Sequence, residues 1–107
     1  MKALTSIEIV EILKQLLPID DPRAYDYRLE FYTKSAMSKL KEEGVENIYE
    51  DATSDEACNY INCIAYQVAK DMDFDLDSNR TDEQYITRVN ELRTSQIKHK
   101  HGNQNNM

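Results

Sequence analysis

The chain has 107 residues and a net charge of −7, with 40% hydrophobic residues, 31% charged residues, two glycines and two prolines. This length and composition are typical of a single helix-rich domain. The excess of acids argues against a protein that holds DNA through its phosphates, and no apolar run is long enough to span a membrane. Cys58 and Cys63 are interpreted as free thiols of a reducing compartment.

The first predicted helix covers residues 6–17. Thr5 followed by Glu8 is the pattern of a capping box, in which each residue satisfies a backbone N–H of the other. Pro18 ends the helix, because the residue before a proline avoids helical backbone angles. The apolar face of this helix consists of Ile9, Val10, Ile12, Leu13, Leu16 and Leu17.

The second predicted helix covers residues 22–43 and has signals at both ends. Asp21 is a natural N-cap, and Pro22 fits the first helical position, where its missing N–H costs nothing. Gly44 is the residue expected in a left-handed conformation just past the helix, with Val45 folding back onto the last turn. The core stripe is Tyr25, Leu29, Tyr32, Ala36 and Leu40.

The third predicted helix covers residues 54–72 and is expected to be the most buried. Thr53 and Glu56 form a second pattern of the capping-box type at its start. Its apolar stripe is unusually wide, because small and sulfur-containing residues extend it on both sides. The stripe contains Ala57, Cys58, Tyr60, Ile61, Cys63, Ile64, Ala65, Val68, Ala69 and Met72.

The fourth predicted helix covers residues 82–97 and starts after Thr81. Its stripe is Tyr85, Ile86, Val89, Leu92 and Ile97. Residues 98–107 are polar and have no apolar anchor before the last residue, so we expect a tail that is disordered in the isolated chain. The sequence therefore predicts an all-α fold, a compact four-helix bundle over residues 1–97 followed by a disordered C-terminal tail over residues 98–107.

The stretch "DMDFDLDSNRTDE", residues 71–83, carries most of the excess negative charge. Its alternating acids resemble a calcium loop, but in both registers the glycine at position 6 and the glutamate at position 12 are missing. We favour a solvated acidic surface. Acids at the negative end of a helix dipole should end the third helix near Asp71. The acids of this surface are Asp71, Asp73, Asp75 and Asp77.

No catalytic or metal-binding arrangement is legible in the sequence. His99 and His101 have no partner ligands, and the only basic residue near the two cysteines is Lys70. There is no glycine-rich phosphate loop and no Ser–His–Asp set. We expect a protein that is not an enzyme and holds no cofactor or metal.

Two aromatic residues outside the predicted core stripe suggest a protein interface. Tyr27 and Phe31 lie off the main stripe of the second helix. Exposed aromatics favour protein contacts because they bury a large area at little entropic cost. The alternative, that another helix of the same chain covers them, remains open at this stage.

The order of the elements resembles the head–tail connector (adaptor) proteins of tailed bacteriophages. The likeness covers "LTSIEIVEILKQLLPIDDP", "DYRLEFYTKSAMSKLKEEG", "DEACNYINCIAYQVAKD" and "YITRVNELRTSQI", the last with Leu92 and Arg93 as its Leu-Arg ending. The chain departs from the family where the third helix closes. An aspartate ladder replaces the usual aromatic–acid–Asn–Arg run, and Asn79-Arg80 is displaced.

The resemblance implies a structural virion subunit, assembled in the host cytoplasm, that forms a ring beneath the portal and guides DNA passage. The implied partners are its own copies (a dodecamer being one option), the portal protein and the next connector or stopper, with no specific DNA binding and no membrane. The interface candidates are Tyr27, Phe31, Lys98, His99, Lys100 and His101, and the aspartates would face the channel or a loop. The alternative is a small intracellular acidic regulatory or adaptor protein that binds another protein, acting as a DNA mimic.

Overall fold

A computed structural model describes residues 2–17, 22–72 and 82–105 of the chain, with side chains for 2–17, 27–72 and 82–98. The described residues form helices and no strand, which confirms the predicted all-α fold. The elements are α1 (Ser6–Leu16), α2 (Pro22–Glu42), α3 (Asp55–Asp71) and α4 (Asp82–Asn105).

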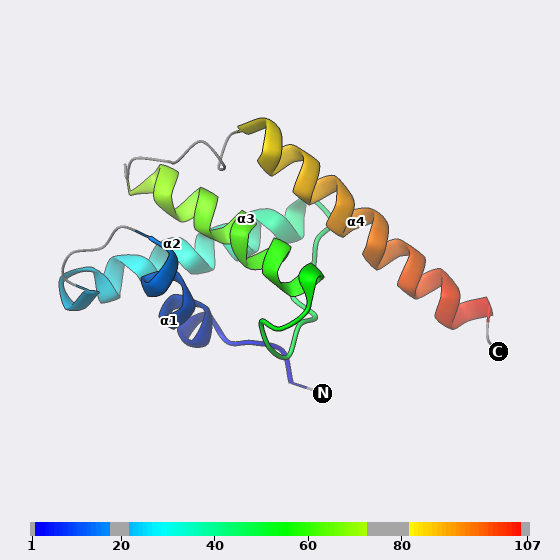
Figure 1. The fold of residues 1–107 in the computed structure, drawn as a ribbon, viewed down its shortest axis with the longest axis horizontal. Helices are drawn as coiled ribbons and strands as arrows, with labels where there is room; N and C mark the ends of the chain where they lie inside the picture. Colours follow the sequence, from blue (N-terminus) through cyan, green and yellow to red (C-terminus); the bar gives the residue numbers. More distant parts are fainter. Residues whose placement is uncertain (1, 18–21, 73–81, 106–107) are drawn as a thin grey trace.

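The third helix forms the centre of the fold (Figure 1). Helix α3 packs against α2 on one side and α4 on the other, and α1 packs mainly against α2. The far end of α4 extends beyond the other helices, on the right of Figure 1. Most large side chains with almost no solvent exposure come from α1, α2 and α3, so the core lies where these helices meet.

The start of α1 confirms the predicted capping box. The Glu8 backbone N–H donates to the Thr5 hydroxyl at 3.2 Å, and the Thr5 N–H donates to the Glu8 carboxylate at 3.0 Å. The helix ends at Leu16, because Leu17, which precedes Pro18, has extended backbone angles. Leu17, the predicted last residue of the helix, is therefore its C-cap.

The end of α2 confirms the predicted glycine ending. Gly44 has a φ of +89°, and the N–H of Val45 donates to the carbonyl of Leu40 at 2.8 Å. This is the long backbone bond of a Schellman ending. Val45 is fully buried, as expected for a residue that folds back on the helix. Asp21, the predicted N-cap, lies outside the described residues.

The start of α3 corrects one sequence prediction. The N-cap is Ser54, whose hydroxyl accepts from the Ala57 N–H at 3.1 Å, and not Thr53. Thr53 instead donates through its N–H and its hydroxyl to the Asp51 carboxylate, at 3.0 and 2.6 Å. The aspartate competes for the threonine and shifts the cap by one residue. The predicted end near Asp71 and the deep burial of α3 are confirmed.

The buried face of α4 differs from the predicted one. Ile86 and Ile97 are 57% and 49% exposed, although both were assigned to the core stripe. The inward row is Tyr85, Val89, Leu92 and Gln96. These positions follow the three- and four-residue spacing of one helix face, and each isoleucine lies about 100° away from it. A glutamine thus takes the core position that the sequence analysis gave to an isoleucine.

Helix α4 also runs to Asn105, past the predicted end at residue 97. The sequence boundary was drawn at the last apolar residue, but lysine, histidine and glutamine can continue a helix without one. The disorder expected of residues 98–107 in the isolated chain stays a prediction.

Candidate interaction surfaces

The predicted aromatic pair on α2 is exposed. Tyr27 is 85% and Phe31 is 61% solvent-accessible, so no other described part of the chain covers them. The Phe31 ring meets the half-buried Tyr32 ring edge to face, with centroids 5.4 Å apart. That contact holds the Phe31 ring in place at the surface. Of the two readings left open by the sequence, coverage within the chain is wrong for the described residues.

These aromatics face away from the core. Among the described side chains of α2, the buried ones are Leu29, Thr33, Ala36 and Leu40. At about 100° per residue, Tyr27 and Phe31 lie on the opposite side of the helix. Burial of α2 against α3 therefore leaves this outer side of the helix exposed.

The basic end of the chain lies on α4. Lys98 is exposed, and the backbone of residues 99–101 continues the helix. The side chains of His99, Lys100 and His101 lie outside the described residues. Among the α4 residues whose side chains the structure describes, Gln96 is the last buried one, and Ile97 and Lys98 after it are exposed.

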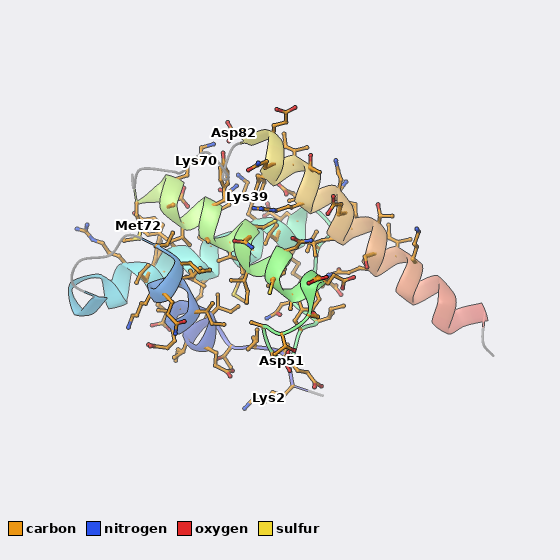
Figure 2. The ribbon with its side chains drawn as sticks, viewed as in Figure 1. Lys2, Lys39, Asp51, Lys70, Met72 and Asp82 are labelled. Carbon is orange, nitrogen blue, oxygen red and sulfur yellow. The ribbon has the colours of Figure 1, made fainter. Side chains whose placement is uncertain are left out.

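The predicted acidic surface is only partly described. Asp71 is exposed at the end of α3, whereas Asp73, Asp75 and Asp77 lie outside the described residues. Figure 2 shows Lys70 and Asp82 close together, where α3 ends and α4 begins, and their charged groups are 3.3 Å apart. Lys70 also lies 5.7 Å from the centre of the Tyr66 ring, so this ion pair joins the two helix ends over an aromatic surface.

A polar network missed by the sequence analysis holds α4 to the connector between α2 and α3. The Gln96 amide donates to the Glu46 carbonyl at 2.9 Å and to the Tyr49 hydroxyl at 3.1 Å, and it accepts from the Glu46 N–H at 3.0 Å. The Tyr49 hydroxyl donates to the Glu56 carboxylate at 3.1 Å, and Ser95 donates to the same carboxylate. Burial raises the pKa of Tyr49 to about 12, so the hydroxyl stays protonated at neutral pH.

The position of Gln96 was the available signal for this network. It lies four residues after Leu92 and eleven after Tyr85, on the inward row of α4. A polar residue at such a position predicts a hydrogen-bonded partner in the core. The sequence does not show which partner, because Glu46 and Tyr49 lie in a connector without helical periodicity.

The cysteines are free thiols, as predicted, but Cys58 lies outside the buried face of α3 to which the sequence had assigned it. Both are free thiols; Cys58 is exposed and its thiol donates to the Ala52 carbonyl at 3.3 Å. Cys63 is buried in α3, and this burial raises the pKa of its thiol to about 12. A buried thiol that stays protonated is a poor nucleophile, so Cys63 has a packing role.

The described residues also contain a groove of about 530 Å³ between the start of α1 and the second half of α2. Lys34 and Asn47 are among the residues that line it. Lys34 is paired with Glu30 at 3.3 Å, and the Asn47 amide donates to the Leu4 carbonyl at 2.7 Å. Lys34 and Nδ2 of Asn47 are thus engaged within the fold, whereas the buried Oδ1 of Asn47 has no hydrogen-bond partner among the described residues.

Within the described ranges, no group of three or more His, Cys, Asp or Glu residues is arranged to hold a metal ion. None of the helices, over the part of the chain that the structure describes, combines the length and apolar character needed to cross a bilayer.

Comparison of the chain with protein-family models, with curated proteins and with solved structures returns no match in any of the three.

Proposed function

We propose that this protein is a structural subunit of a tailed-bacteriophage head–tail connector, which forms a ring beneath the portal and extends the channel through which DNA passes. The proposal starts from the sequence resemblance to that family. In this role the protein is not an enzyme, and it is part of the virion after assembly in the host cytoplasm.

The observation that carries the proposal is the length of α4. The helix is anchored up to Gln96 and continues to Asn105, so that its last part extends beyond the body of the protein (Figure 1). A projecting helical arm with Lys98 and Lys100 suits an insertion into a partner, where its backbone hydrogen bonds are already made. The exposed aromatic pair on α2 supports a second contact at a distance from the arm.

The proposal is tested by mixing the full chain with portal rings encoded by the same genome and imaging the mixture by electron microscopy. We expect an added ring of density at one end of the portal. A variant truncated after Lys98 should keep the thermal unfolding midpoint of the full chain, because every described hydrogen bond between α4 and the connector lies at or before Gln96. It should lose portal binding. A full-length chain that leaves the portal bare contradicts the proposal.

A second candidate function rests on a different observation. Residues 42–56, which comprise the connector between α2 and α3 and its flanks, contain acidic residues and no lysine or arginine. Glu42, Glu50, Asp51 and Asp55 are all exposed. Such a surface suits a small acidic regulator that binds a DNA-binding protein in place of DNA. Competition between this chain and duplex DNA for a polymerase or nuclease of the same phage would favour that function over the connector.

A further inference from the structure

The groove between the start of α1 and the second half of α2 has the size of a small-molecule site. Its volume of about 530 Å³ lies within the roughly 300–1,000 Å³ of pockets that hold such ligands. Leu4, Met37 and Tyr60 supply the apolar part of the lining; Leu4 and Tyr60 are buried, and Met37 is partly buried. This part of the groove suits an apolar ring, because the ring and the side chains would remove each other from water.

A buried tyrosine in this lining has an unpaired hydroxyl. Tyr60 is 1% exposed, and its hydroxyl makes no hydrogen bond to another described residue. In the described chain, the fully enclosed side-chain oxygens without a partner belong to Thr33 and Asn47, so the Tyr60 hydroxyl keeps access to the groove. Burial raises the pKa of Tyr60, and the hydroxyl therefore stays protonated at neutral pH, able both to donate and to accept.

Asn47 adds an unpaired acceptor to the same groove. Its Nδ2 donates to the Leu4 carbonyl, but its Oδ1 has no partner among the described residues. The residue is half-buried, so a small tilt of the amide opens Oδ1 to the groove. A buried polar group without a partner costs stability, and a ligand that pairs with it recovers that free energy on binding.

The α2 side of the groove is basic. Lys34, Ser38 and Lys41 follow one another at spacings of four and three residues, so they lie on one face of the helix. Lys41 forms no ion pair with a described residue, and the pair of Lys34 with Glu30 is exposed and therefore weak. Glu46, the only acid among the described lining residues, belongs to the connector. An anionic group is thus attracted to the α2 side of the groove.

We infer that this groove binds a nucleoside monophosphate, with the base in the apolar part and the phosphate at Lys34 and Lys41. A nucleobase has apolar faces, and its edge carries an N–H donor for Asn47 and polar atoms for the Tyr60 hydroxyl. The two lysines are about 10 Å apart along the helix, within reach of one phosphate. Inorganic phosphate would engage only the lysines, and an uncharged nucleoside only the inner groups. This inference goes beyond the proposed connector role and does not depend on it.

The test follows the amide signals of the isotope-labelled full chain by NMR while AMP, GMP, CMP and UMP are added separately, up to about 10 mM. At least one nucleotide should cause saturable shifts at Leu4, Lys41 and the Asn47 side-chain amide. Inorganic phosphate and uncharged adenosine should each bind about tenfold or more weakly. The inference is overturned if no nucleotide shifts these signals, or if inorganic phosphate alone shifts them with the same affinity.

Two variants locate the ligand. Lys41→Gln should weaken nucleotide binding about fivefold, because the phosphate loses a charged partner. Tyr60→Phe should weaken it about threefold and keep the wild-type unfolding midpoint or raise it, since the hydroxyl is unpaired in the free protein. Lys39→Gln is the matched control, an exposed lysine of α2 outside the groove lining, and should bind like the wild type. Wild-type affinity in either Lys41→Gln or Tyr60→Phe would overturn the proposed binding mode.

Discussion

The guanidinium of Arg93 donates through Nε to the backbone carbonyl of Glu43 at 2.7 Å, and this bond connects the middle of α4 to the end of α2. The carbonyl belongs to the helix terminus, where backbone acceptors have no partner within the helix. The positive charge also lies at the negative end of the α2 dipole. One side chain therefore satisfies the end of one helix and fixes the position of another.

Replacing Arg93 by methionine should lower the free energy of unfolding by about 1–2 kcal/mol, because the part-buried carbonyl loses its charged donor while the aliphatic packing is kept. Urea unfolding followed by far-UV circular dichroism measures the change. The free energy of unfolding of Arg93→Lys should lie between those of the wild type and the methionine variant, since an ammonium keeps the charge but not the fork geometry. A methionine variant as stable as the wild type would show that water replaces this bond without cost.

Gly44 gives a second prediction at the same junction. Its φ is +89°, and a Cβ placed there would lie 3.4 Å from Nε of Arg93. Gly44→Ala should lower the free energy of unfolding by about 1–2 kcal/mol, because a side chain is strained in this conformation. Gly44→Asn adds the same Cβ but tolerates the conformation better, so its loss should be smaller. Equal losses in chemical denaturation would assign the effect to contact with Arg93 and not to the backbone.

The helix ends were predictable because their signals are local. Thr5 with Glu8 and Gly44 with Val45 act within one turn, so the sequence alone indicates their geometry. Ser54 was missed because Asp51, two residues before Thr53, engages the threonine. Such competition among neighbouring polar residues is decided by the shape of the connector, which periodicity does not describe.

The exposed residues likewise fall into those that local helical spacing predicts and those that it does not. Tyr27 and Phe31 were predicted to be off the core stripe, and helical spacing alone was enough for that. Ile86 and Ile97 were wrongly predicted to be buried, because hydrophobicity alone favours an isoleucine over Gln96 at a core position. Gln96 is buried since the backbone of Glu46 supplies both a donor and an acceptor for its amide. That pairing spans half of the chain and leaves no local signal.

The Gln96 network leads to a third prediction. Gln96→Ala should lower the free energy of unfolding by about 2–3 kcal/mol, since it strands the part-buried backbone of Glu46 and removes a partner of the Tyr49 hydroxyl. Tyr49→Phe removes the same hydroxyl from the other side. In a double-mutant cycle the two changes should couple by about 0.5 kcal/mol or more. Strictly additive losses would mean that the observed 3.1 Å contact does not stabilise the fold.

Thr33 offers a change in the opposite direction. It is fully buried in α2, and its hydroxyl has no hydrogen-bond partner among the described residues. Thr33→Val should raise the free energy of unfolding by about 1 kcal/mol, because it replaces an unpaired polar group by a methyl group of similar shape. Thr33→Ser keeps the hydroxyl but opens a methyl-sized gap, so it should destabilise the protein. Thermal unfolding of the wild type, Thr33→Val and Thr33→Ser measures these differences in stability. A valine variant that melts below the wild type would contradict the prediction.

The capping box of α1 makes stability depend on pH. The backbone N–H and the hydroxyl of Thr5 donate to the Glu8 carboxylate, and they lower the pKa of that group below its ordinary value of 4.5. A carboxyl with a lowered pKa in the folded state contributes stability that is present above its unfolded pKa. This contribution is lost as the pH falls through the folded pKa. We therefore expect the unfolding midpoint to drop on acidification below about pH 4.5.

In Glu8→Gln the amide cannot titrate, so its unfolding midpoint should fall less between neutral pH and about pH 3 than that of the wild type. Glu50→Gln is the matched control, because it removes an exposed carboxylate of the same kind from the connector. A scan of the unfolding midpoint against pH for the three proteins separates the capping effect from the loss of one negative charge. If Glu8→Gln and Glu50→Gln shift the curve equally, the carboxylate of Glu8 acts only through net charge, and the capping box has no part in the acid response.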